Sequence, residues 1–149
     1  MQNRFWRYLP LDPPTPASVT AFLDRRLADR WGDGGYQCAI ELTDAQHLIG
    51  TVRIAIDDPA HRSGDIGYAL NGASSGRGYR TEAVSRILQL CFEELDLHRL
   101  SATTDVENDA SWRVMERLGM QREGRLRHHR QVRGTWRDSY LHAILKSDR

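Results

Sequence analysis

Apolar residues recur along this chain with two spacings, one typical of helices and one typical of strands. Apolar side chains three or four positions apart predict amphipathic helices over about 15–31, 79–95 and 109–118. Their apolar stripes are Val19, Phe22, Leu23, Leu27 and Trp31 in the first; Val84, Ile87, Leu88, Cys91, Phe92 and Leu95 in the second; and Ala110, Val114, Met115 and Leu118 in the third. Helix-start signals precede the first and third stripes, and glycines follow them.

Alternating apolar and polar positions predict six strands. They span about 36–43, 48–56, 65–71, 98–106, 120–128 and 135–146. In the second strand we expect Leu48, Val52, Ile54 and Ile56 on the buried face, and a polar loop over 57–64 follows it. After an irregular lead-in at 1–14, the order is helix, hairpin, strand, helix, strand, helix, hairpin. Antiparallel hairpins with two helical crossovers predict an α+β fold, with residues 1–149 forming a single domain.

A glycine-rich turn, Gly76-Arg77-Gly78-Tyr79-Arg80-Thr81-Glu82-Ala83, joins the third strand to the second helix. Backbone N–H groups and the positive end of the helix dipole converge there, and Arg77 and Arg80 add charge. Such a turn can hold a pyrophosphate, although it is neither a P-loop nor a dinucleotide fingerprint. On these residues alone, a turn without any ligand is an equal alternative.

Composition narrows the function classes. Apolar residues make up 40% of the chain, and 21 Lys and Arg against 20 Asp and Glu leave a net charge of +1. Bulk charge therefore does not argue for nucleic acid or membrane as a partner. Cys38 and Cys91 lie in apolar segments, so we expect buried free thiols rather than a disulfide or a metal site. Without a long apolar run or a signal peptide, we expect a cytoplasmic location.

With its element order, the chain resembles the GNAT N-acetyltransferase superfamily, and within it the RimJ/RimL-type branch. The resemblance covers roughly residues 19–146. It is carried by Leu48-Ile49-Gly50-Thr51, Asp65-Ile66-Gly67-Tyr68, Gly76-Arg77-Gly78-Tyr79, Thr81-Glu82-Ala83, Phe92 to Arg99, Asn108-Asp109-Ala110-Ser111, Glu116-Arg117-Leu118-Gly119-Met120, Glu123-Gly124-Arg125 and Gly134-Thr135-Trp136-Arg137-Asp138. It implies a mixed, mostly antiparallel sheet flanked by helices.

The resemblance also implies a reaction: an amine attacks the thioester of acetyl-CoA directly. The glycine turn would hold the pyrophosphate, the strand before it would pair with the pantetheine arm, and free N–H groups of that strand would stabilise the oxyanion. The cofactor-binding residues so implied are Tyr68, Ala69, Leu70, Ser75, Gly76, Arg77, Gly78, Tyr79, Arg80, Thr81, Asn108 and Ser111. In the RimJ/RimL branch the serine matching Ser111 is the proposed proton donor to the departing thiolate.

This chain departs from the family pattern at several positions. Ser75 stands where Gln or Arg is usual, and Arg80 stands where a small residue is usual, so Arg80 either crowds the turn or grips a phosphate. Met115 stands where many members have a proton-donating tyrosine. The family's first strand and part of its first helix are expected to be missing, which leaves the strand at 36–43 as a bare edge. The chain is then naturally clipped or a fragment, or another protomer covers that edge, which predicts a homodimer or a swapped element.

Several roles stay open at the level of sequence. Asn108 either caps a helix or contacts pantetheine. Asp65 is a candidate general base through a water, or a surface carboxylate. His128 and His129 are alternative bases, since a neutral imidazole accepts protons near pH 7, or ordinary surface histidines; the prediction takes Ser111, Asp65 and His129 as catalytic. Asp138 either binds the acceptor amine or pairs with an arginine.

The acceptor is not encoded in a motif, because the loops expected to shape it, 57–64 and 129–133, contain none. Eight arginines against two acids in 113–137 form either a solvated face or a site for an acidic protein, ribosomal RNA or the 3′-phosphate of CoA. Three hypotheses follow: acetylation of a protein N-terminal α-amine; acetylation of a small amine such as an antibiotic, polyamine or amino acid; and a non-catalytic acyl-CoA-binding module. None of them involves a metal or a membrane, and nucleic acid is not expected.

Overall fold

The computed structural model describes residues 15–28, 35–44 and 47–149. The predicted lead-in at 1–14 and Trp31 lie outside these residues. The elements are α1 (Pro16–Ala28), β1 (Gly35–Leu42), β2 (His47–Asp58), β3 (Ser63–Leu70), α2 (Tyr79–Glu93), β4 (Arg99–Asp105), α3 (Asp109–Arg117), β5 (Gln121–Val132) and β6 (Thr135–Leu145), with short 3-10 turns at Gly72–Ser74 and Lys146–Asp148. The predicted order of elements is therefore confirmed over the described part of the chain.

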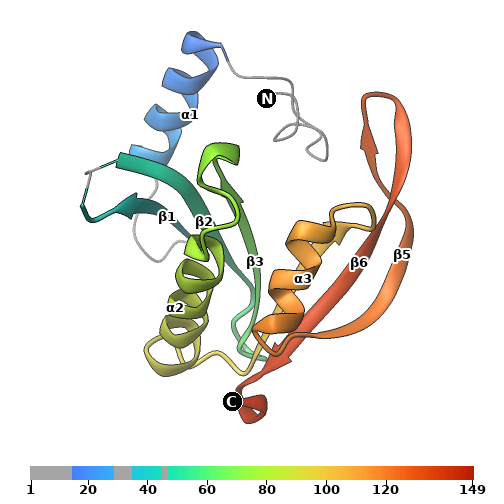
Figure 1. The fold of residues 1–149 in the computed structure, drawn as a ribbon. Coiled ribbons are helices and arrows are strands. Elements are labelled where there is room, and N and C mark those ends of the chain that lie inside the picture. Colours follow the sequence, from blue (N-terminus) through green and yellow to red (C-terminus); the bar gives the residue numbers. More distant parts are fainter. Residues whose placement is uncertain (1–14, 29–34, 45–46) are drawn as a thin grey trace.

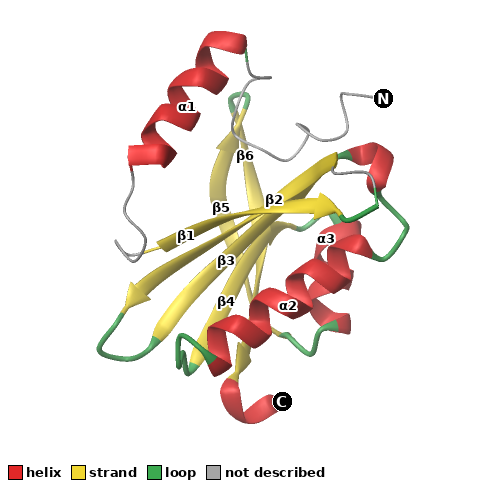
Figure 2. Ribbon diagram, turned by 90° about the vertical axis from the view of Figure 1, so that its left-hand side faces the viewer, coloured by secondary structure: helices red, strands yellow, loops and turns green. Residues whose placement is uncertain are grey.

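The strands form one six-stranded sheet in the order β1-β2-β3-β4-β6-β5. Only the β3–β4 pair is parallel; the other neighbours run antiparallel. This is the expected mixed, mostly antiparallel α+β sheet. Helices α2 and α3 lie together on one face, and α1 lies apart from them in the view of Figure 2. Within the described residues β1 pairs only with β2, so it forms an edge, as expected.

The core lies between the sheet and helices α2 and α3. The apolar stripe of α2 buries Val84, Leu88, Cys91 and Phe92, which pack against Ile54, Ile66 and Leu100 of three neighbouring strands. Each fully buried side chain of this size contributes about 1.5–3 kcal/mol relative to exposure. Helix α3 ends at Arg117, and Gly119 follows the C-cap residue Leu118 with a φ of 85° that suits glycine. No helix in the described residues is long and apolar enough to span a bilayer.

The structure contains β-bulges in β2 and β5 that the predicted strand patterns lack. Ile40 pairs with Gly50 and Glu41 with Leu48, so Ile49 is the extra residue. A bulge changes which side chains face the core: Ile49 is buried, and Leu48, predicted to be buried, is 58% exposed. In β5, residues 127–129 lie between the pairs Leu126–Ser139 and Arg130–Arg137, and β5 continues to Val132. The predicted loop at 129–133 is therefore mostly strand.

Smaller corrections concern burial and loop length. The loop predicted at 57–64 is shorter, because β2 extends to Asp58 and β3 begins at Ser63. Ala110 and Val19, both predicted to face inward, are exposed. Cys91 is buried as predicted and both cysteines are free, but Cys38 is only partly buried.

Candidate active site

A gap opens between β3 and β4, the two parallel strands. They pair at only three positions, Ser63–Arg99, Gly64–Leu100 and Asp65–Ser101. Beyond Asp65, β3 pairs only with β2, and β4 continues along β6. Figure 1 shows β3 diverging from the β6 side of the sheet. Since every second residue of an antiparallel strand directs its N–H and C=O away from its partner, β3 has free backbone groups along this gap.

The glycine turn lies at the end of β3 and starts α2. Gly76 and Gly78 both have φ near 83°, a conformation that favours glycine, and Gly78 is the N-cap of α2. The amides from Gly76 to Thr81 donate no hydrogen bond to another described backbone group; Ser75 N–H donates to Gly72 and Glu82 N–H to Gly78. A row of free donors at a helix N-terminus suits an anion.

Arg80 does not fold into the turn. Its Nη1 donates to the carbonyl oxygen of Ala110 at 3.3 Å, which places the guanidinium beside the N-terminus of α3. Its Nε is buried without a hydrogen-bond partner. Thus Arg80 does not crowd the turn, and it adds positive charge where the N-terminal ends of α2 and α3 approach each other.

Tyr68 and Ser111 join β3 to α3. The Tyr68 hydroxyl donates to the carbonyl oxygen of Ser111 at 3.0 Å, and Ser111 Oγ donates to the Tyr68 hydroxyl at 3.2 Å. Burial raises the pKa of Tyr68, whereas the Ser111 hydrogen bond and the Arg80 charge lower it. Ser111 is buried, so it is not a solvated helix serine. The sequence analysis assigned a role only to the backbone of Tyr68. Its alternation with Ile66 and Leu70 could have indicated that the Tyr68 side chain lies on the buried face of β3.

Asn108 and Met115 are two further positions that the sequence singled out. Asn108 is the N-cap residue of α3, as one of its two alternatives expected, although its side chain makes no capping hydrogen bond. Its carbonyl oxygen accepts from Ser111 N–H at 2.9 Å, which ties it to the start of the helix. Met115 is 3% exposed and packs in the core, so this position does not face solvent.

Asp65 lies where the β3–β4 pairing ends, and alternation places it on the face of β3 opposite Tyr68. Its carboxylate pairs with Arg53 on β2. Burial raises the pKa of Asp65, opposed by the charges of Arg53 and Arg130 and reinforced by that of Asp57. Arg130 crosses from β5 to donate to Thr103 Oγ1 on β4 at 3.3 Å. The Asp65 carboxylate is thus half-buried, is paired with Arg53 and is influenced by the charge of Arg130, so it is not a free surface group.

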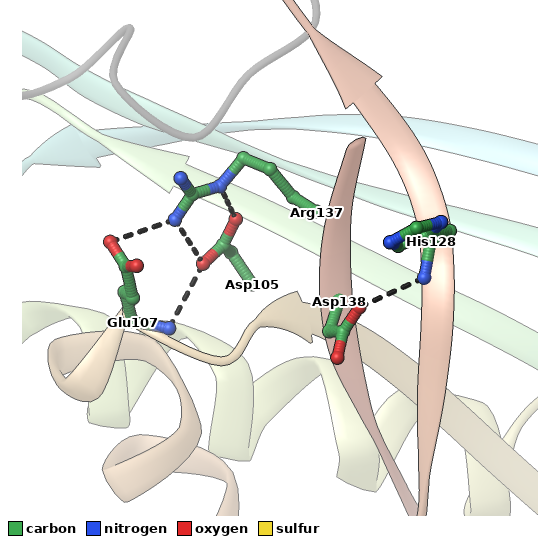
Figure 3. Close-up of polar contacts among 5 residues, drawn as sticks. All are labelled: Asp105, Glu107, His128, Arg137 and Asp138. Atoms are coloured by element: carbon green, nitrogen blue, oxygen red, sulfur yellow. Dashed lines mark hydrogen bonds and ion pairs between the residues drawn. The ribbon is translucent and has the colours of Figure 1, made fainter. Parts of the chain in front are cut away.

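The other predicted polar residues lie on β5 and β6. Asp138 pairs with Arg125 at 2.7 Å and accepts from the backbone N–H of His128 at 2.9 Å (Figure 3), so the arginine-pair alternative describes it. His128 has φ 47° in the bulge, and its ring stacks on Trp136. His129 is exposed over much of its surface. Partial desolvation of its ring and the charge of Arg130 lower its pKa, which keeps the imidazole neutral at pH 7. The Asp138 carbonyl oxygen accepts from Val106 N–H, just past β4, at 3.2 Å, whereas its carboxylate is bound by Arg125 and by the backbone of His128.

A network missed by sequence reasoning fixes the turn before α3. Arg137 of β6 donates to both carboxylate oxygens of Asp105 and pairs with Glu107 at 2.8 Å (Figure 3). Asp105 Oδ1 also accepts from the backbone N–H of Glu107 at 2.9 Å. This network holds residues 105–108, and hence the N-terminus of α3 with Ser111, against the sheet.

The cysteines do not suit an acetyl-cysteine intermediate. Cys91 is fully buried, and burial raises its pKa to about 12, so its thiolate is scarce at neutral pH. Burial also raises the pKa of Cys38. Cys38 lines a cavity of about 450 Å³ between β1 and α2, away from the Tyr68–Ser111 contact. Direct attack of the amine on the thioester therefore fits the described residues better than a covalent enzyme intermediate.

The glycine turn yields a binding prediction. Val at Gly78 adds a Cβ where backbone amides must approach a phosphate, and one charge-assisted hydrogen bond contributes about 1.5–3 kcal/mol. We therefore expect Gly78→Val to weaken acetyl-CoA binding by calorimetry about 10- to 100-fold. Gly134→Val is the matched control, because Gly134 also has positive φ and open space where a Cβ would stand, but lies in the β5–β6 turn. Unchanged affinity in a folded Gly78→Val variant would show that the phosphate site is elsewhere.

A mixed sheet that opens between two parallel strands, beside a glycine turn at a helix N-terminus, defines a class of acyl-CoA-dependent transferases. Residues 1–121 match the acetyltransferase (GNAT) domain family, and the chain belongs to it. The chain is 32% identical over 142 residues to a protein of Bacillus subtilis (strain 168) named uncharacterized N-acetyltransferase YnaD, covering 95% of this chain and 81% of that protein. It is therefore an acetyl-transferring enzyme, not a non-catalytic module, and GNAT acetyltransferases use acetyl-CoA.

Other relatives are named for their acceptors. The chain is 28% identical over 83 residues to the [ribosomal protein uS5]-alanine N-acetyltransferase of Escherichia coli (strain K12), covering 56% of this chain and 43% of that one. It is 30% identical over 105 residues to the spermidine N(1)-acetyltransferase of Vibrio cholerae, covering 70% and 61%. The structure of the ribosomal-protein-S5-alanine acetyltransferase of Vibrio fischeri has a TM-score of 0.87 at 22% identity, covering 99% and 82%. The two relatives are named for different acceptors, and the solved structure shows the shared fold.

Proposed function

We propose that this enzyme transfers the acetyl group of acetyl-CoA to a protein N-terminal α-amine by direct attack. The observation that carries the proposal is the gap between β3 and β4, with free backbone groups on one side and the Tyr68–Ser111 pair at its edge. Pantetheine would pair with Tyr68 to Leu70, and the amides of Gly76 to Thr81 would hold the pyrophosphate. Positioning of the two reactants supplies about 7–11 kcal/mol in such reactions.

Charge favours a peptide acceptor over a polyamine. On the face of the sheet opposite α2 and α3, the half-buried Asp65 is shared with Arg53, and Arg130 lies near it. A polycation needs several free carboxylates, whereas here the charges of Arg53 and Arg130 offset those of Asp65 and its neighbour Asp57. A peptide N-terminus presents one amine and a chain of neutral amides, which this arrangement tolerates. The 30%-identical spermidine acetyltransferase keeps a small amine as the second candidate.

We propose Asp65 as the general base, acting through a water, with His129 as the alternative. Asp65 pairs with Arg53 and lies where the gap begins, and the raised pKa of its carboxyl makes it a better base than an exposed aspartate. His129 is neutral at pH 7, but its lowered pKa weakens it as a base. The whole of residues 1–149 would form one acetyltransferase domain located in the cytoplasm.

The test is an acceptor panel in which release of the CoA thiol is measured. It sets peptides beginning with Ala, Ser or Met against the same peptides with blocked N-termini, and against spermidine and free amino acids. We expect thiol release with free peptide N-termini, and mass spectrometry should place the acetyl group on the α-nitrogen. Preference for spermidine or amino acids would overturn the peptide assignment while leaving acetyl transfer intact.

We also propose a homodimer, because the outer edge of β1 has no partner among the described residues and long bare edges are rarely left open. Light scattering should give about twice the 17.1 kDa mass of the chain. A monomer at high concentration would contradict the dimer.

A further inference from the structure

The contact between Tyr68 and Ser111 is a chain of two hydroxyl groups. Ser111 Oγ donates to the Tyr68 hydroxyl at 3.2 Å, and the Tyr68 hydroxyl donates to the Ser111 carbonyl oxygen at 3.0 Å. Both residues are held on regular elements, β3 and α3, and both are largely removed from water. A small rotation of the Tyr68 O–H would direct its proton from the carbonyl oxygen to Ser111 Oγ. The same pair can therefore hold protons in two arrangements.

Serine alone is a poor acid for the reaction that this site must complete. A departing thiolate such as that of CoA needs a donor of matched acidity, and a thiol titrates near about 8.5. A free phenol, near about 10, is close to it, whereas an aliphatic hydroxyl is a much weaker acid than either. Burial raises the pKa of Tyr68 above that of a free phenol, and the Ser111 hydrogen bond and the Arg80 charge act against this rise. A serine that gives up its proton must therefore take one back as it does so. Among the described residues, the hydrogen-bond partner placed to return that proton is Tyr68.

We propose that Tyr68 supplies the proton that Ser111 passes to the departing CoA thiolate. This inference rests on the proposed acetyl transfer. As the C–S bond breaks, sulfur takes the proton of Ser111 Oγ, and Ser111 Oγ takes the proton of Tyr68. The balance is one proton from Tyr68 to sulfur, without oxidation or reduction. Tyr68 remains as a phenolate until CoA leaves and water returns a proton. Its side chain acts through Ser111, as a positioning residue, and does not touch the reacting atoms.

The surroundings of Tyr68 suit a transient phenolate. Arg80 of α2 is the charged neighbour that acts on its hydroxyl, and it also donates to Ala110 at the start of α3. The buried Nε of Arg80 has no hydrogen-bond partner, so a donor is present that is not committed elsewhere. On the other side Tyr68 pairs with Val52 of β2, which carries no charge. Among the described residues, the charged group that acts on the Tyr68 hydroxyl is therefore the Arg80 cation, which would stabilise a negative charge there.

Tyr68→Phe tests the relay, with Tyr140→Phe as the matched control. Tyr140 is a half-buried tyrosine of β6 whose ring contacts Trp112 edge-on. In single turnovers with the best acceptor of the panel, we expect Tyr68→Phe to lower the rate of acetyl transfer about 10- to 100-fold. The affinity for acetyl-CoA and the Tm should change little, and Tyr140→Phe should keep the full rate.

Two further measurements separate a relay from a tether. The double variant Tyr68→Phe/Ser111→Ala should be no slower than Ser111→Ala, because both changes interrupt one path. The rate should also be measured as the fraction of D₂O in the solvent is increased. For the unmodified enzyme, a plot of rate against D₂O fraction should be curved, because two protons move in the same step. For Tyr68→Phe the plot should be a straight line. A Tyr68→Phe rate within twofold of the unmodified enzyme, or additive losses in the double variant, would overturn the relay. Absence of acetyl transfer by the unmodified enzyme to every acceptor would instead overturn the proposed function.

Discussion

Arg137→Ala is expected to lower the free energy of unfolding by about 3 kcal/mol, the lower end of the range for breaking a buried ion pair. Asp105 is 6% exposed and Arg137 21% exposed, and the guanidinium contacts both oxygens of the carboxylate. Its loss leaves a buried carboxylate unpaired, and the partial exposure of Arg137 keeps the effect at the low end. The carboxylates of Asp105 and Glu107 raise the pKa of Arg137, so it stays charged throughout the usual pH range.

Denaturant unfolding followed by circular dichroism would measure this effect, with Arg125→Ala as the control. Arg125 is 60% exposed, and its partner Asp138, which is 17% exposed, keeps a hydrogen bond from the backbone N–H of His128. Removal of Arg125 should therefore lower stability less than removal of Arg137. Because the network also holds the turn before α3, Arg137→Ala should reduce acetyl transfer in molecules that remain folded. Equal free energies of unfolding for the two variants would show that the Asp105–Arg137 contact stabilises the fold no more than the Arg125–Asp138 pair does.

The sequence predicted the fold well because each element has a local signal. The stripe of α2, the alternation in β4 and the glycine after α3 need no knowledge of distant residues, and all three are confirmed. The bulges in β2 and β5 were missed because strand register depends on the partner strand. Leu48 fits an alternating pattern as well as Ile49 does, and only the pairing with β1 decides which of them is buried.

At the candidate site, backbone features were more predictable than side-chain contacts. The left-handed glycines of the turn could be predicted because few other residues adopt that conformation. The Tyr68–Ser111 contact joins residues 43 positions apart, and Arg137 meets Asp105 across 32 positions. Nothing in local spacing indicates such pairs. From the sequence, Arg80 could likewise be interpreted only as a positive charge in the turn. Its hydrogen bond to Ala110 depends on how α2 packs beside α3.

Ser111→Ala is expected to lower kcat about 100-fold, the low end for general acid–base help. The physical reason is that the hydroxyl acts on the thiolate, which forms only as the C–S bond breaks. Affinity for acetyl-CoA should change little, since the loss is of an interaction made mainly in the transition state. Cys91, with its high pKa, and Met115, buried in the core, offer no replacement donor.

The structure makes this substitution a clean one. Tyr68 donates to the carbonyl oxygen of Ser111, which alanine keeps, so the link between β3 and α3 survives the loss of Oγ. Ser85→Ala, at a half-buried serine of α2, is the control for removing a helix hydroxyl. Single-turnover rates at saturating acetyl-CoA measure the chemical step directly. If Ser111→Ala retains the full single-turnover rate, Ser111 is only a helix residue, and water or the attacking amine protonates the thiolate.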